Sequence, residues 1–127
     1  MERGLTIKIF EGILGVCRLE GSTQIPNWAK GDFLSVTKTA NELSIVCCQK
    51  YIPENVKCER VWRYFRIEET LDFSLIGILA SLSGTLARQG ISLFAISTYD
   101  TDYILVKEKD LAKAIEALTQ AGHRIIK

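Results

Sequence analysis

Two short segments of the sequence combine residue types that could bind a small charged molecule. The first comprises Leu71, Asp72, Phe73, Ser74, Leu75, Ile76 and Gly77, and we expect it to lead from a strand into a helix. Unpaired backbone N–H groups and the positive end of the helix dipole favour an anion at such a turn. A carboxylate is therefore a suitable ligand for this segment.

The second segment lies between two expected strands and offers hydroxyls, carboxylates and aromatic rings. It comprises Ser97, Thr98, Tyr99, Asp100, Thr101, Asp102 and Tyr103. Carboxylates and ring faces together suit an ammonium or guanidinium group. An anion-binding turn close to such a loop is typical of a site for a zwitterion.

Each feature also has a purely structural interpretation. Asp72 is a good helix cap, and Gly77 could allow the helix to pack closely on a sheet. Asp100 and Asp102 are common turn formers, and the two tyrosines could pack against the sheet or a partner. The binding hypothesis depends on the two segments acting together.

The residues give little support for catalysis, a cofactor or a metal site. The single histidine, His123, follows a helix-ending glycine, where we expect a solvated turn residue. No Gly-x-Gly-x-x-Gly or P-loop lysine motif is present, and Gly12 with Gly15 lacks a strand-to-helix setting. We predict a protein that is not an enzyme, although a small enzyme using Cys17 or Cys58 stays open as an alternative.

The four cysteines are best explained as buried thiols. Cys47 and Cys48 are adjacent in an expected strand, so they point to opposite faces and cannot share one metal ion. No Cys-x-x-Cys motif accompanies Cys17 or Cys58. The start of the sequence has no signal-peptide pattern that would favour a disulfide framework.

The second half of the chain shows alternating strands and amphipathic helices in a clear order. We expect strands over 62–67, 91–97, 103–106 and 123–126, with helices over 73–89 and 110–121. Gly90 and Gly122 should end the two helices. The order strand, helix, strand, strand, helix, strand predicts a ferredoxin-like antiparallel sheet with both helices on one face.

The first half shows strands of the same plan without its first helix. We expect strands over 5–10 and 16–19, a hairpin of 33–37 with 43–47, and a short helix or turn over 53–56. The segment 21–31 should be a loop, anchored to the core by Ile25, Trp28 and Ala29. We therefore predict an α+β fold of two tandem ferredoxin-like (βαββαβ) halves, 1–60 and 61–127, the first degenerate.

Composition restricts the classes of partner. The chain has 127 residues, is 47% hydrophobic and carries a formal net charge of +1, which gives no field that gathers nucleic acid. Its apolar runs are far shorter than the roughly 20 residues that span a bilayer. We expect a cytoplasmic protein with neither a nucleic-acid nor a membrane partner.

Segments 71–80 and 91–106, with the Ser-Thr-Tyr-Asp-Thr-Asp-Tyr run at 97–103, resemble the ACT domain family. Within it they are similar to small tandem-ACT bacterial proteins related to aspartate kinase regulatory domains, and to the ACT domains of the cytosolic arginine sensor. Segments 26–29, 33–37 and 42–46 resemble the first half of those bacterial proteins. The resemblance therefore covers nearly the whole chain.

The resemblance implies a regulatory protein that binds a free amino acid at an interface between two ACT units. Gly77 and Ile78 would contact the ligand's α-amino and carboxylate groups through their backbone, and Thr98, Tyr99 and Asp102 would line its side-chain end. Leu75 stands where the sensor has an acidic residue, so the resemblance does not by itself imply specificity for arginine.

The resemblance also bears on partners. Pocket sharing implies a homodimer or packing against the first half. Because the segments that carry the resemblance include no kinase domain, it implies either a protein partner that acts in trans or a protein that only buffers or senses its ligand. The alternative function is a protein–protein interaction module that keeps the fold and has lost ligand binding.

Overall fold

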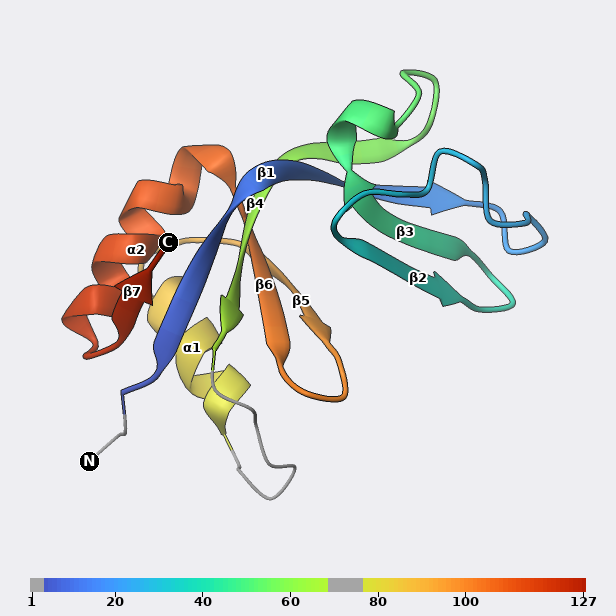
Figure 1. Cartoon of the computed structure of the whole chain (residues 1–127). Helices are drawn as coiled ribbons and strands as arrows, with labels where there is room; N and C mark the ends of the chain where they lie inside the picture. Colours follow the sequence, from blue (N-terminus) through green and yellow to red (C-terminus); the bar gives the residue numbers. More distant parts are fainter. Residues whose placement is uncertain (1–3, 69–76) are drawn as a thin grey trace. The chain divides into compact units, whose positions relative to one another are not determined.

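The computed structural model describes residues 4–68 and 77–127, which form an α+β fold (Figure 1). The strands are β1 (Thr6–Leu19), β2 (Leu34–Lys38), β3 (Leu43–Cys48), β4 (Cys58–Ile67), β5 (Leu93–Ser97), β6 (Asp102–Lys107) and β7 (Arg124–Ile126). The helices are α1 (Ile78–Ala87) and α2 (Leu111–Gln120), with 3-10 turns η1 (Gln49–Tyr51) and η2 (Glu108–Asp110). Neither α-helix in the described part of the chain is long and apolar enough to cross a membrane.

The chain divides into two compact units, and β1 and β4 each supply a segment to both. One unit contains the described residues of Met1–Glu11 and Arg63–Lys127, and the other is Gly12–Trp62. The sequence-based division into 1–60 and 61–127 places its boundary close to the second of these junctions. That 1–60 is a degenerate copy of the same fold stays a prediction.

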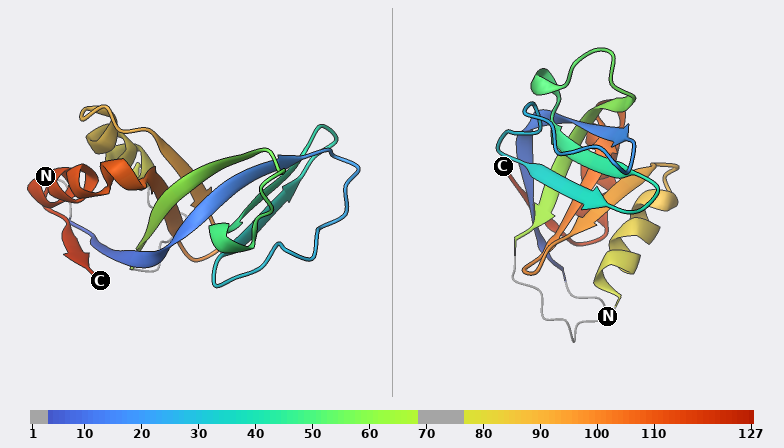
Figure 2. Two further views of the ribbon diagram at one scale, coloured as in Figure 1. Left: turned by 90° about the horizontal axis from the view of Figure 1, so that it is seen from above. Right: turned by 90° about the vertical axis from the view of Figure 1, so that its right-hand side faces the viewer.

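The first unit is a sheet with two helices on one face (Figures 1 and 2). Its strand order is β7-β1-β4-β6-β5. β7 pairs with the beginning of β1 in parallel, and β5 pairs with β6 antiparallel. The expected ferredoxin-like order is thus modified, because β1 lies between the last strand and β4.

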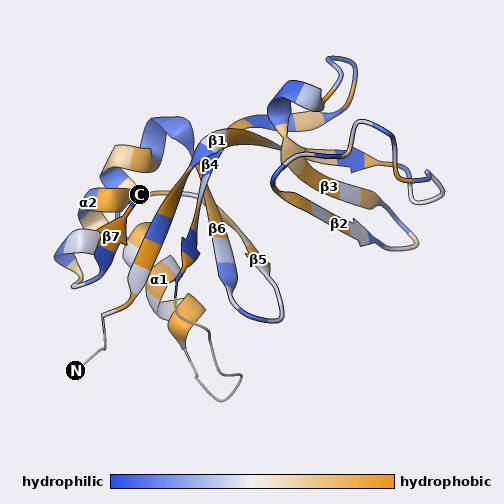
Figure 3. Ribbon diagram, viewed as in Figure 1, coloured by the Kyte–Doolittle hydropathy of each residue, from blue (hydrophilic) through white to orange (hydrophobic). Residues whose placement is uncertain are grey.

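The core of this unit follows from the strand alternation. The beginning of β1 alternates polar and apolar residues (Figure 3), and its apolar residues Ile7 and Ile9 are buried in one cluster with residues of both helices. Phe65 and Ile67 of β4 do the same. The buried cluster comprises Leu5, Ile7, Ile9, Phe65, Ile67, Leu82, Leu86, Ile91, Ile104, Val106, Ala114 and Leu118. The side chains at the alternate positions of these strands, among them Phe10 and Arg66, lie on the other face of the sheet.

Both helices end as the glycines predict. Gly90 (φ 73°) and Gly122 (φ 99°) adopt left-handed conformations. Ile91 N–H donates to Leu86 O at 3.1 Å, and His123 N–H donates to Leu118 O at 3.1 Å. These are the long bonds of a Schellman motif, which satisfies carbonyls at a helix end. α1 itself starts at Ile78, later than the Phe73 expected from the sequence.

The second unit contains four strand segments in the order β2-β3-β1-β4, and η1 is its helical turn. The predicted hairpin is confirmed, with Lys38 opposite Leu43. The two expected strands over 5–10 and 16–19 are one continuous strand, β1, in which Gly12 has φ 110°. Trp28 and Ala29 anchor the 21–31 loop to the core as expected, whereas Ile25 is 58% exposed.

Candidate functional site

The β5–β6 hairpin holds the second predicted segment in a defined turn. Ser97 lies opposite Asp102, and the Ser97 hydroxyl donates to Asp102 Oδ1 at 2.5 Å. Thr98 N–H donates to Thr101 O at 2.8 Å, and Thr98 Oγ1 accepts from Thr101 N–H at 3.2 Å. Hydroxyl-to-backbone bonds of this kind fix turns. The hydroxyls therefore hold the shape of the loop.

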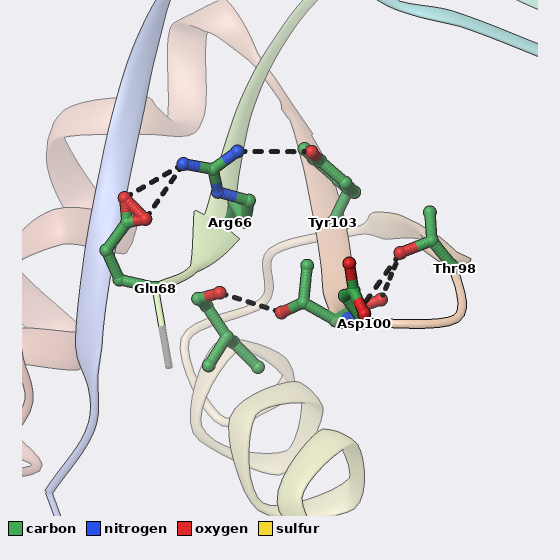
Figure 4. Close-up of a pocket in the computed structure, with 7 residues that line it drawn as sticks. Arg66, Glu68, Thr98, Asp100 and Tyr103 are labelled. Carbon is green, nitrogen blue, oxygen red and sulfur yellow. Dashed lines mark hydrogen bonds and ion pairs between the residues drawn. The ribbon is translucent and has the colours of Figure 1, made fainter. Parts of the chain in front are cut away.

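A pocket of about 230 Å³ lies beside this hairpin (Figure 4). Its lining comprises Arg66, Ile67, Glu68, Thr98, Asp100, Thr101 and Tyr103. Thr101 Oγ1 donates to Ile67 O at 2.7 Å, which ties the hairpin to the end of β4. The pocket therefore offers both signs of charge and several hydroxyl groups. Its volume is several times the volume of about 30 Å³ that one water molecule occupies in the liquid. These groups could contact a small molecule that carries both signs of charge.

Arg66 supplies a positive charge to the pocket, and several side chains hold its guanidinium in position. It donates to Glu68 Oε1 and Oε2 at 2.9 and 2.8 Å, and to the Tyr103 hydroxyl at 3.3 Å. It also lies over the Phe10 ring, 4.9 Å from the centroid. Hydrogen bonds to Glu68 and then to Tyr103 raise the pKa of Arg66 above its ordinary value. These contacts therefore hold the planar, positively charged guanidinium in one place.

The structure brings some of the predicted residues to this pocket and places others elsewhere. Thr98, Asp100 and Thr101 line it. Ser97 and Asp102 are not among its lining residues and bind each other at the hairpin's base. Tyr99 is 82% exposed at the tip.

The first predicted segment is described only from Gly77. Asp72, Phe73, Ser74, Leu75 and Ile76 lie outside the described residues. Gly77 precedes α1 with φ 84°, and its carbonyl accepts the helix's first bond from Ser81 N–H. Among the residues that the structure describes, nothing other than its chain neighbours lies within 4 Å of the position that a Cβ would take there. The glycine is thus needed for its backbone conformation, and the close-packing alternative is wrong.

Tyr103, from the second predicted segment, also lines the pocket, whereas Arg66 and Glu68 are pocket residues that sequence reasoning missed. The run of aromatic and basic residues over 62–67 held a signal, because strand alternation places Tyr64 and Arg66 on one face. Phe10 stacks on Tyr64 at 5.0 Å between ring centroids, so it belongs to the same face. The sequence alone did not show that Phe10 shares a face with Tyr64 and Arg66, because this depends on the pairing of β1 with β4.

His123 is buried, which corrects the expectation of a solvated turn residue. It is 7% exposed, and its Nδ1 accepts a hydrogen bond from Leu5 N–H at 3.1 Å. Arg124 N–H donates in turn to Leu5 O at 2.8 Å. His123 therefore joins the ends of β1 and β7 and has a structural role.

The cysteines are free thiols. Cys17 and Cys47 are buried as predicted, whereas Cys48 and Cys58 are half-buried. Within residues 4–68 and 77–127, no group of three or more His, Cys, Asp or Glu side chains is arranged to hold a metal ion.

Comparison with known proteins places this architecture in a family. The family model described as "ACT domain" matches residues 57–120, half of the chain, and a second model, of an N-terminal domain, matches residues 12–55. The chain belongs to the ACT domain family.

The relatives by sequence are amino-acid sensors. The human "Cytosolic arginine sensor for mTORC1 subunit 1" is 31% identical over 107 residues, which cover 78% of this chain and 32% of the sensor. The cattle sensor is 41% identical over 59 residues, covering 46% of this chain and 18% of that protein. The chain thus spans about a third or less of the length of these relatives.

Solved structures share the fold over almost the whole chain. A protein of Agrobacterium tumefaciens superimposes with a TM-score of 0.93 and 38% identity, covering 98% of this chain and 94% of that one. The regulatory subunit of aspartate kinase from Thermus thermophilus gives a TM-score of 0.62 at 10% identity, covering 91% and 97%. At that identity the second likeness shows the fold alone.

Proposed function

We propose that the chain is a non-catalytic regulatory protein that binds a free amino acid at the pocket beside the β5–β6 hairpin. The observation that carries this proposal is the convergence of Arg66, Asp100 and the hairpin hydroxyls on one pocket of about 230 Å³. Membership of the ACT domain family supports it, as does similarity to a protein named an arginine sensor.

The charges suggest an orientation for the ligand. The Asp100 carboxylate can accept hydrogen bonds from an ammonium group, since charge-assisted bonds of this kind are the strong ones. The first backbone N–H groups of α1, from Ile78 onward, have no partner within the helix and suit a carboxylate. Thr98, Tyr99 and Asp102 would then lie toward the ligand's side chain, as the family resemblance implies.

The ligand would lie where two ACT units meet, in a homodimer. Two copies related by a two-fold axis would form two equivalent sites. Occupancy would favour one arrangement of the units, and a partner protein acting in trans would respond to that arrangement. We expect this to occur in the cytoplasm, the location in the name of the related sensor.

One observation favours the alternative of an interaction module without a ligand. The Arg66 guanidinium is already bound by Glu68 and Tyr103, so a ligand carboxylate would have to compete with Glu68 for it. On this alternative the ion pair completes the surface, and the domain acts only through protein contacts.

A thermal-shift panel separates the two functions. A ligand that binds only the folded chain raises Tm in proportion to the logarithm of its concentration above Kd. We expect one amino acid, or a few of related chemistry, to raise Tm at millimolar concentration. An unchanged Tm across all the common amino acids would contradict ligand binding and favour the interaction module.

A further inference from the structure

Two thiols face each other across neighbouring strands of the Gly12–Trp62 unit. The Cys17 thiol of β1 donates a hydrogen bond to Cys58 Sγ of β4, with the two sulfur atoms 3.5 Å apart. The pair is 41 residues apart in the sequence. The contact is therefore made by the fold and is absent from any local motif.

The register of the two strands suits a covalent bond at this position. β1 and β4 are neighbours in the sheet, and Arg18 N–H donates to Lys57 O at 3.0 Å, one residue away from each cysteine. Non-hydrogen-bonded pairs of an antiparallel ladder have Cα atoms about 4.5 Å apart. Disulfides join Cα atoms about 4.4–6.8 Å apart. The 3.5 Å between the two sulfur atoms and the adjacent backbone bond together favour closure by rotation of the side chains.

Gly15 leaves the space that the Cys58 side chain occupies. A Cβ at Gly15 would lie 2.8 Å from Cys58 Sγ, closer than real contacts allow. Gly15 and Cys17 are two residues apart in β1, so they lie on the same face. The bare backbone at Gly15 lets the Cys58 sulfur turn toward Cys17.

We propose that Cys17 and Cys58 form a reversible disulfide when the protein meets a small-molecule disulfide such as oxidised glutathione. Cys58 is half-buried and reacts first, whereas Cys17, only 2% exposed, resolves the mixed disulfide from inside. This is a modification site separate from the pocket beside the β5–β6 hairpin.

The two steps are thiol–disulfide exchanges. The Cys58 thiolate attacks one sulfur of oxidised glutathione, forming a mixed disulfide and releasing one glutathione thiolate. Cys17 then loses its proton and attacks Cys58 Sγ, which forms the Cys17–Cys58 bond and releases the second glutathione. The two cysteines are oxidised by two electrons, and one glutathione disulfide is reduced to two glutathione molecules.

The environment of the thiols agrees with this order. Burial, followed by the hydrogen bond with Cys58, raises the pKa of Cys17 well above its ordinary value. Burial likewise raises the pKa of Cys47, the other fully buried thiol of this unit. Both thiols therefore stay protonated and unreactive toward solvent oxidants, because the thiolate is the nucleophile. Cys17 reacts only when an activated sulfur is placed beside it.

The bond would close a loop that contains β2, β3 and η1. A disulfide that closes a long loop stabilises a fold chiefly by restricting the unfolded chain. Oxidation should therefore raise Tm, by roughly 10 °C for a domain of this size. A dithiol reductant should return Tm to its starting value.

The test uses the full chain, reduced and then treated with oxidised glutathione before the remaining thiols are alkylated. Intact-mass spectrometry before alkylation should show a loss of two hydrogens, and non-reducing peptide maps after alkylation should link the Cys17 peptide to the Cys58 peptide. Cys48→Ser is the matched control and should oxidise like the parent. Cys17→Ser should stop at glutathione on Cys58, and Cys58→Ser should abolish the bond.

Two results would overturn the proposal. One is a parent protein that keeps glutathione on Cys58 or stays fully reduced, since Cys17 would then fail to resolve. The other is a bond that joins Cys47 or Cys48 in place of the proposed pair. Both readouts come from the unsubstituted chain, so they hold even if a cysteine variant folds poorly.

Discussion

Asp100 is the residue whose charge the binding proposal uses most directly. Asp100 is one of the residues that line the pocket, whereas the Asp102 carboxylate accepts a hydrogen bond from Ser97 where the turn begins. Asp100→Asn keeps the shape and removes the charge, so we expect about tenfold weaker binding of the amino acid that raises Tm, or about 1.4 kcal/mol. Calorimetric titration measures this. Asp32→Asn, an exposed carboxylate of the other unit, is the control, and equal affinity of both variants would rule out the role of Asp100.

We expect His123 to stabilise the fold through the hydrogen bond that it accepts from Leu5 N–H. His123→Ala leaves the buried Leu5 N–H without its acceptor, which costs about 1–3 kcal/mol of the free energy of unfolding. Arg124→Ala, on an exposed neighbour, should change it by at most about 0.5 kcal/mol. Urea denaturation followed by circular dichroism compares the two. Similar losses for both variants would show that the Leu5–His123 bond contributes nothing specific.

At the scale of the element, the helix ends provide a matched pair of glycine substitutions. Gly122 has φ 99°, and in the described part of the chain nothing beyond its immediate neighbours lies within 4 Å of the position that a Cβ would take, so Gly122→Ala tests backbone conformation alone. Holding alanine in the left-handed region costs about 1–2 kcal/mol, so the free energy of unfolding should fall by that amount.

Gly84 is the control for that substitution, because it lies inside α1 with ordinary helical backbone. A Cβ at Gly84 makes a normal contact of 3.5 Å with Arg88 Nη1. Gly84→Ala should raise the free energy of unfolding by up to about 1 kcal/mol, since alanine favours helices. Loss of stability in both variants would contradict the assignment of Gly122 to a conformational role.

The elements also show which parts of the fold the sequence can predict. Alternation and helical spacing are local, so they located the second-half strands, and the glycines located the helix ends. Strand pairing is not local. The parallel pairing of β7 with β1 joins residues more than a hundred positions apart, as does the contact between Leu5 and His123.

The same distinction between local patterns and strand pairing applies to the candidate site. The hairpin residues Thr98, Asp100 and Thr101 were predicted because they form one short segment. Arg66 and Glu68 were missed because the pairing of β4 with β6 brings them to the hairpin. An ion pair between Arg66 near the end of β4 and Glu68 just after it has no special sequence pattern.

At the scale of the whole molecule, the proposal links ligand binding to association of two chains. A ligand held between two ACT units favours the dimer, so added ligand should shift the measured mass toward twice the 14.3 kDa of the chain. Size-exclusion chromatography with light scattering checks this at several protein concentrations. Saturable binding to a chain that stays monomeric throughout would contradict the dimer and leave a site within one chain.

The central claim is that a free amino acid binds beside the β5–β6 hairpin, and amide NMR of the isotope-labelled chain tests it most directly. Titration with the amino acid that raises Tm, or with pools of all the common amino acids, should give saturable shifts at the amides of 66–68, 77–78 and 98–103. The Gly12–Trp62 unit should show shifts only where a dimer contact reaches it. An unchanged spectrum, or saturable shifts that leave the hairpin unaffected, would contradict the account.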